Sequence, residues 1–401
     1  MRLVLSGRPS SVARVAEGVM TAEVVFWMSV ALVLYAYAGY PCALWVLSGI
    51  RRRPVVKADI APTVTFIITA HNEEERLASK IENTLRQDYR GLLDVIVASD
   101  CSTDRTDEIA QACRPRVQLV RAGERRGKEA AQGLAVRVAS GDILVFSDVA
   151  TALEPSGVST IVRNFADPTV GCVSSIDRFV DADGRPSGEG AYVRYEMFLR
   201  VLETRVNTVV GLSGSFFAVR RTLCDRWATD CQSDFACLLN TVERGLRGVL
   251  DTDSVGYYRN IADERLEFQR KVRTVVRGLY VLATHARLLN PLRYGLFAWQ
   301  LASHKLCRWL VPFGMAGALV SSALLASGST FYSAMLAGQT AFYAIAIAGQ
   351  WGDLGILRIP SFLLLANLAV LAAWFRYIRG DRMMVWKPSE RATELPRATA
   401  R

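Results

Sequence analysis

The chain has 401 residues, of which 51% are hydrophobic and 21% are charged. This length exceeds that of a small binding module, and the composition excludes a disordered or collagen-like chain. Forty-eight Lys and Arg residues against 38 Asp and Glu residues give a net charge of +10, which suits an anionic membrane surface or a phosphate-bearing ligand. The eight cysteines form no C-x-x-C pair, so the pattern indicates neither a zinc cage nor the disulfide framework of a small secreted protein.

The first apolar segment is a candidate membrane anchor. The 27 residues from Val24 to Ile50 carry no charge, and about 20 apolar residues are enough to cross a bilayer. Arg51, Arg52, Arg53 and Lys57 follow directly, where a cleaved signal peptide would have a small-residue cleavage site. We therefore expect residues 1–57 to form a tail and a retained transmembrane helix, with the downstream side in the cytoplasm because basic residues favour that side.

Two uncharged segments near the C-terminus are further candidates. Residues 309–352 have room for two spans broken near Ser327–Ser329, and residues 359–375 are long enough for a third. Three crossings would place the basic tail, 379–401, outside, although its charge favours the cytoplasm. The sequence predicts transmembrane segments over 309–378 and leaves open whether one of them is re-entrant or interfacial.

The region 58–262 has the pattern of a doubly wound α/β domain, in which short β-branched runs alternate with helical stretches. The predicted strands are 64–69, 93–98, 117–120 and 143–146, and the predicted helices between them are 73–87, 104–112 and 128–140. Ligands of such sheets bind beyond the carboxyl ends of the strands. Those ends carry acidic loops here, 70–74, 99–104 and 147–151, so we expect a site at this edge.

The acidic loops have a purely structural alternative, in which Asp100, Asp104 and Asp148 cap helices or stabilise turns. Neither G-x-G-x-x-G after the first strand nor a P-loop motif occurs, which argues against a dinucleotide oxidoreductase or a P-loop enzyme. Three such loops at successive strand ends favour an active site.

Six motifs follow one another along the chain: AHNEE at 70–74, SDCSTDRT at 99–106, RGKEAAQ at 126–132, FSDVAT at 146–151, GLSGSFFAVRR at 211–221 and QSDF at 232–235. In this order they resemble the family 2 glycosyltransferases, specifically the membrane-embedded polysaccharide synthases that include hyaluronan, chitin and cellulose synthases. The resemblance implies a GT-A (Rossmann-like) catalytic domain between an N-terminal transmembrane helix and a C-terminal transmembrane bundle. It also implies basic interfacial helices over 263–308.

The resemblance assigns roles to individual residues. It implies a UDP-sugar donor bound by Thr69, Ala70, Glu73, Asp100, Lys128 and Asp148, an acceptor side at Gly214 and Ser215, and a diphosphate-binding group of Arg270, Lys271 and Arg273. Asp234 is the expected general base of an inverting transfer, because a carboxylate must take the proton from the attacking hydroxyl. The alternatives are a solvated Lys128, an N-cap role of Asp234 for a helix over 235–244, and basic residues of 267–273 that lie on anionic lipid.

Two departures from the family pattern affect the expected function. Position 150 is Ala, so Asp148 is the only carboxylate left in this motif to hold Mg²⁺ or Mn²⁺ together with donor phosphates. Cys101 replaces the usual Gly and would be strained at a positive φ. We expect a multi-pass inner (plasma) membrane enzyme that extends an exopolysaccharide or capsule glycan, without a nucleic-acid partner. The missing Q-x-x-R-W motif leaves open single addition to a lipid-linked acceptor, and the departures leave open an impaired scaffold subunit.

Overall fold

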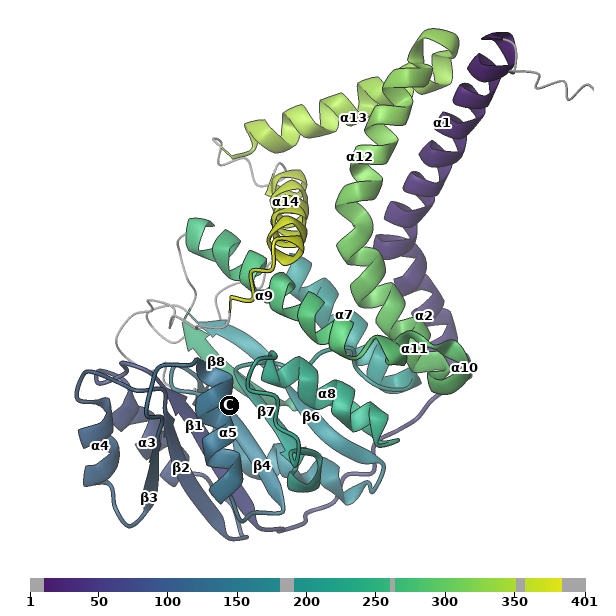
Figure 1. The fold of residues 1–401 in the computed structure, drawn as a ribbon. Helices are drawn as coiled ribbons and strands as arrows, with labels where there is room; N and C mark the ends of the chain where they lie inside the picture. Colours follow the sequence, from purple (N-terminus) through teal and green to yellow (C-terminus); the bar gives the residue numbers. More distant parts are fainter. Residues whose placement is uncertain (1–10, 181–190, 260–263, 351–357, 384–401) are drawn as a thin grey trace, which may run out of the picture. The chain divides into compact units, whose positions relative to one another are not determined.

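The computed structural model describes residues 11–180, 191–259, 264–350 and 358–383, which group into two units. One unit holds the segment up to Cys42 and Ala302–Phe375, and the other holds Ala43–Leu301 and the residues from Arg376 onward. The first unit is built from apolar helices and the second around a sheet (Figure 1).

The described residues include helices long enough to cross a membrane, and most of their residues belong to the apolar unit. Candidate spans are Glu17–Ile50, Leu296–Gly328, Thr330–Ala348 and Ile359–Ile378. The helices are α1 (Ser11–Leu34), the π-helix η1 (Tyr35–Gly39), α2 (Tyr40–Ile50), the π-helix η5 (Ala302–Cys307), α12 (Arg308–Leu325), η6 (Ala326–Gly328), α13 (Thr330–Ala348) and α14 (Arg358–Ile378). The described residues of the predicted apolar segments are therefore helical except at Ser329 and at the turn of residues 349–350, and the break expected near residues 327–329 falls at η6 and Ser329. Residues 351 and 352 of the second segment lie outside the described part.

The second unit is built on an eight-stranded sheet with the order β3-β2-β1-β4-β7-β6-β8-β5. Strands β1, β2, β3 and β4 are mutually parallel, whereas β7 runs antiparallel to β4 and β6. The strands are β1 (Val64–Ala70), β2 (Leu93–Ser99), β3 (Val117–Arg121), β4 (Ile143–Asp148), β5 (Ala152–Leu153), β6 (Val170–Val180), β7 (Phe216–Arg220) and β8 (Arg247–Arg259). The register pairs Thr69 of β1 with Asp148 of β4, so the ends of these strands lie side by side.

Helices complete the sheet domain, and α5 and α8 lie in front of the sheet in Figure 1. All seven residues of β1 are buried, as a central strand covered on both faces requires. The helices are α3 (Leu77–Leu85), α4 (Thr106–Ala112), α5 (Lys128–Val138), α6 (Gly157–Val162), η2 (Arg163–Ala166), α7 (Ala191–Val206), η3 (Arg221–Leu223), α8 (Ser233–Glu243), α9 (Glu264–Thr284), η4 (Ala286–Leu289), α10 (Pro291–Tyr294) and α11 (Leu296–Leu301).

The four predicted strands and three predicted helices are confirmed, with helix ends displaced by two residues in α4 and α5 and with a larger shift at the start of α3. Helix α3 begins at Leu77 rather than at Glu73. The preceding loop is held out of helical geometry, because Asn72 has a φ of 53° and the backbone N–H of Glu73 donates to Thr106 Oγ1 at 2.7 Å.

Candidate active site

One polar cluster is formed by the end of β4, the residues just before β7 and the first turn of α5. The Asp148 N–H donates to the Ser215 carbonyl at 3.0 Å. The Lys128 ammonium donates to Asp148 Oδ1 at 2.5 Å and to the Gly214 carbonyl at 2.9 Å. The Lys128 side chain is only 11% exposed. The solvated alternative for Lys128 is therefore wrong, and the structure brings together predicted donor and acceptor-side residues.

Asp234 faces this cluster from the first turn of α8. A Cβ atom at Gly214 would lie 3.0 Å from Asp234 Oδ2, so the carboxylate lies directly against the backbone of this glycine. Burial raises the pKa of Asp234, while the charges of Lys128 and Arg277 and the Phe235 N–H oppose that rise. Helix α8 begins at Ser233 with Gln232 at the N-cap, so the interpretation of Asp234 as the N-cap is wrong.

A row of arginines on α9 adds positive charge. Arg277 forms an ion pair with Glu129 of α5, and both side chains are largely buried. Arg273 lies one turn before Arg277, and burial, followed by the charges of Arg277 and Arg270, lowers its pKa. Arg270 donates to Glu267 at 2.8 and 2.9 Å. The expected diphosphate-binding arginines, Arg270 and Arg273, thus share one face of α9 with Arg277. Arg277 was not predicted from the sequence, although it follows Arg273 by one helical turn.

Lys271, the third residue of the predicted diphosphate group, has a different setting. Its ammonium lies 4.0 Å from Glu267 Oε1, on the same helix. Burial lowers the pKa of Lys271, the charge of Glu267 opposes this shift and that of Arg270 adds to it. The role of Lys271 toward a diphosphate stays a prediction.

The predicted nucleoside residues lie at the ends of β1 and β2. Asp100 is fully buried, and its carboxylate accepts from the backbone N–H groups of Arg126 and Gly127 at 3.0 to 3.1 Å. This carboxylate therefore tethers the loop that precedes α5. The Ala70 carbonyl accepts from the Asp100 N–H at 2.9 Å, and Thr69 Oγ1 accepts from Gln132 at 3.1 Å.

Two residues of these loops have largely structural surroundings. Glu73 accepts from its neighbour Arg76, at 2.8 Å from Nε and 2.7 Å from a terminal nitrogen. Asp104 accepts from the Thr106 N–H at 3.0 Å, as a residue at a helix start does. The N-cap of α4 is Arg105, so Asp104 stabilises the turn before this helix, which is the second of the two structural roles expected for it. Cys101 adopts a φ of 54°, the positive value at which Cys is strained and Gly is not.

Two further polar residues next to the cluster were not singled out from the sequence. Asp177 of β6 accepts from Ser213 Oγ at 2.6 Å and from Ser215 Oγ at 2.5 Å, which places a second carboxylate beside the predicted acceptor-side serine. Lys80 of α3 is fully buried and donates to the Thr151 carbonyl at 2.6 Å. Burial lowers the pKa of Lys80 to about 7, and the charge of Asp148 opposes this shift.

Asp148 offers the chemistry of a divalent-metal ligand but only one carboxylate. Carboxylate oxygens suit Mg²⁺ and Mn²⁺, which also accept phosphate oxygens and waters. Ala150 supplies no ligand, and among the described residues no group of three or more His, Cys, Asp and Glu side chains is arranged to hold a metal ion. The cluster therefore fits a metal that takes most of its ligands from a bound diphosphate.

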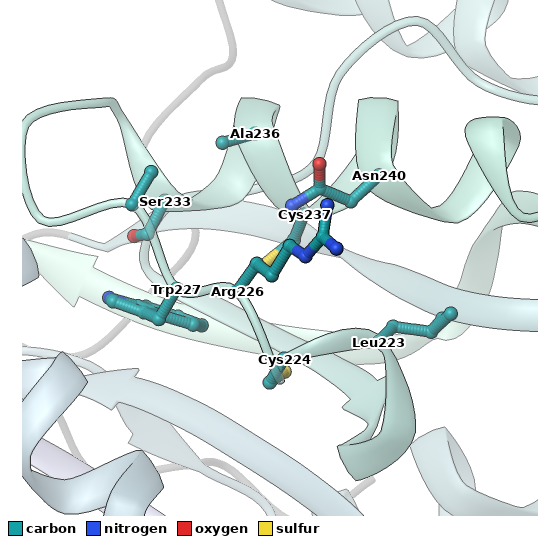
Figure 2. Close-up of a pocket in the computed structure, with 9 residues that line it drawn as sticks. Leu223, Cys224, Arg226, Trp227, Ser233, Ala236, Cys237 and Asn240 are labelled. Carbon is teal, nitrogen blue, oxygen red and sulfur yellow. The ribbon is translucent and has the colours of Figure 1, made fainter.

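A small pocket beside α8 is distinct from this cluster (Figure 2). Its lining includes Cys224, Trp227 and Cys237 but none of Lys128, Asp148 and Asp234. Trp227 stacks on Phe146 with ring centroids 5.0 Å apart. The lining is mostly apolar and is unsuited to a diphosphate.

Comparison with solved structures defines the class of fold. The mannosyltransferase PcManGT from Pyrobaculum calidifontis, solved in complex with GDP-Man and Mn²⁺, superposes with a TM-score of 0.71 over 89% of this chain and 99% of that chain, at 23% sequence identity. The likeness shows a shared GT-A fold, which apolar helices flank along this chain, and the predicted fold class is confirmed.

Sequence comparison then gives a family for part of the chain. Residues 65–227 match the family model described as Glycosyl transferase family 2. The N-acetylglucosaminyltransferase of Sinorhizobium fredii is 32% identical over 123 residues, 29% of this chain and 30% of that protein. The poly-beta-1,6-N-acetyl-D-glucosamine synthase of Staphylococcus aureus is 25% identical over 133 residues, 32% of each chain. The matches span less than a third of these relatives. The chain carries a family 2 glycosyltransferase domain, and the predicted resemblance is confirmed.

Proposed function

We propose that this chain is an inverting glycosyltransferase that transfers a sugar from a UDP-sugar to a growing exopolysaccharide or capsule glycan. The observation that carries the proposal is the convergence of Lys128, Asp148 and Asp234 at the strand ends of the family 2 domain. The relatives support a glycan product, because their names describe N-acetylglucosaminyl transfer and, in one case, a polysaccharide synthase.

Asp234 acts as the general base of the transfer. The acceptor hydroxyl gives its proton to the Asp234 carboxylate as its oxygen attacks the anomeric carbon, and the nucleoside diphosphate leaves from the opposite side. Burial raises the pKa of Asp234, which makes it a stronger base than an exposed aspartate. The charges of Lys128 and Arg277 oppose this rise and favour the ionised form that accepts the proton.

The cations around the cluster stabilise the leaving group. Lys128 reaches the cluster from α5, and Arg273 and Arg277 line one face of α9. Positive groups that are already in position lower the barrier, because negative charge develops on the diphosphate as the glycosidic bond breaks. When bound at Asp148, a divalent cation would neutralise part of the same charge.

The domain limits stay a proposal. We assign 1–57 to the tail and anchor, 58–262 to the catalytic domain, 263–308 to basic interfacial helices, 309–378 to membrane helices and 379–401 to a basic tail.

We also propose that the catalytic domain and the C-terminus share the cytoplasmic side. Within the catalytic unit, Tyr377 packs on Tyr280 with ring centroids 4.7 Å apart, and the Arg382 guanidinium lies 5.5 Å from the same ring. The chain leaves this unit after Leu301 and returns to it at Arg376. A return to the same side requires an even number of crossings, so one of the three helices α12, α13 and α14 does not cross. Helix α13 has the lowest mean hydropathy of the three and is the one we propose does not cross.

One observation favours a second candidate, the addition of a single sugar to a lipid-linked acceptor. The Q-x-x-R-W motif of processive synthases is absent, and α9 carries Arg270, Lys271 and Arg273 instead. The length of the product separates the two candidates. Detergent-purified protein supplied with nucleotide sugar and either glycan oligomers or lipid phosphates should yield a ladder of products if it is processive and one added sugar if it is not. A protein that consumes no donor would support the scaffold alternative.

A further inference from the structure

Lys128 and Asp148 form a close ion pair at the position that a metal would share. The ammonium lies 2.5 Å from Asp148 Oδ1, at the end of β4, and 2.9 Å from the Gly214 carbonyl, in the loop before β7. The Lys128 side chain is 11% exposed and that of Asp148 is 26% exposed. Asp148, the only carboxylate of this motif, thus already has a cationic partner, and its side chain is partly exposed to solvent.

The neighbouring carboxylates of the described residues have contacts of their own, since Asp177 accepts from Ser213 and Ser215 and Asp234 accepts from Gln232. Glu129, the next carboxylate along α5, is paired with Arg277. Buried Lys80 adds a further amine close enough for Asp148 to influence it. Ala150 contributes no ligand. A divalent cation that arrives alone must therefore displace an ammonium from a carboxylate that is already neutralised.

We propose that Lys128 is a resident counter-ion of Asp148 that the metal must displace, and that the nucleotide diphosphate drives this exchange by giving the ammonium a new anionic partner. The inference rests on the proposed function and adds an order of binding to it. Metal and nucleotide then bind as a unit, and the protein without nucleotide has little affinity for metal. The same exchange brings Lys128 to the diphosphate, where its charge is needed when the sugar is transferred.

The test measures free Mn²⁺ by electron paramagnetic resonance during titration of the full-length protein in detergent without nucleotide. Wild-type protein should bind Mn²⁺ weakly, and addition of UDP should increase its affinity at least about tenfold, because the diphosphate supplies charge at ion-pair distance. Lys128→Met frees the Asp148 carboxylate and should bind Mn²⁺ without UDP at least about tenfold more tightly than wild type does. Arg137→Met, which removes one exposed charge from the same helix, is the matched control and should match wild type.

Two results would overturn the exchange: Mn²⁺ binding by wild type that UDP leaves unchanged, or no gain of nucleotide-free Mn²⁺ binding in Lys128→Met. Lys128→Gln serves as a second variant if the Met variant does not fold. Failure of the proposed function is recognised separately, since it would appear as no binding of UDP or GDP by wild type at any metal concentration. In that case the comparison of nucleotide-free Mn²⁺ binding by wild type and the two Lys128 variants still tests whether Lys128 competes with the metal for Asp148.

Discussion

The general-base role of Asp234 makes a quantitative prediction for the variant Asp234→Asn. The substitution keeps the shape of the side chain and an oxygen able to accept the hydrogen bond from Gln232, which is 3.1 Å long in the wild type. It removes the carboxylate that takes the proton. Since burial already penalises the charged form, the neutral variant should fold at least as stably as the wild type.

The expected loss follows from the chemistry of a positioned base. A group of this kind contributes about 10² to 10⁴ in rate, so kcat should fall by at least about 10², or about 2.7 kcal/mol in activation free energy. Nucleotide affinity should change little, because Asp234 lies on α8 and not in the loops at the ends of β1 and β2. The loss therefore belongs in kcat rather than in donor binding.

The assay is transfer of radiolabelled sugar by purified protein, with UDP affinity measured by calorimetry on the same preparations. Asp230→Asn is the matched control, because the same chemical change then falls on a half-exposed carboxylate four residues earlier. Turnover by Asp234→Asn within a few-fold of wild type would remove Asp234 from the mechanism. An equal loss of turnover in Asp230→Asn would assign the effect to a disturbance of the loop before α8 rather than to the loss of the general base.

Four further outcomes are expected. Asp100→Ala should weaken UDP binding by about 1 to 3 kcal/mol in calorimetry, since a buried acceptor is lost, and an unchanged Kd would contradict its role. Ala150→Asp should tighten Mn²⁺ binding in the presence of UDP by adding a carboxylate ligand, and no gain in a metal titration would place the metal elsewhere. Arg277→Gln removes a charge that lowers the pKa of Asp234, so the acid limb of the kcat profile, where activity is lost as pH falls, should move to higher pH; an unmoved limb would exclude this coupling. Folding lowers the pKa of Lys80 from 10.5 to about 7, so between these pH values the unfolded chain binds more protons and the stability of the wild type rises with pH. Lys80→Met should flatten this rise of Tm with pH, and an equal slope in the two proteins would contradict the shift.

The strands and the central cluster were predictable because their signals are local. The runs at 64–69 and 143–146 are apolar and β-branched, and the polar loops after them mark the strand ends where ligands of this fold bind. The positions of Asp148, Lys128 and Asp234 along the chain then followed the motif order of the family. The start of α3 was misjudged because Asn72 and Glu73 are held by the neighbouring loop, an interaction that the local pattern does not contain.

The residues that escaped prediction depend on contacts between distant segments. Lys80 has the sequence context of an exposed helix lysine, and its burial arises only where α3 packs against the segment that follows β4. Glu129 and Arg277 occur on separate helices, and either one alone suggests a solvated face. Asp177 interrupts an apolar strand without belonging to a motif. Its two serine partners precede β7, a neighbour of β6 only in the folded sheet.

Donor turnover by wild-type protein and Asp234→Asn, with Mn²⁺ present and absent, is the most direct test of the proposed enzyme. A panel of radiolabelled UDP- and GDP-sugars would be offered to detergent-purified protein with membrane lipid extract as the acceptor. The expected result is consumption of one UDP-sugar by the wild type, dependent on Mn²⁺, with release of UDP and a rate at least about 10² lower in Asp234→Asn. Consumption of no nucleotide sugar by well-folded wild-type protein, or equal consumption by both proteins, would contradict a transferase that uses Asp234 as its base.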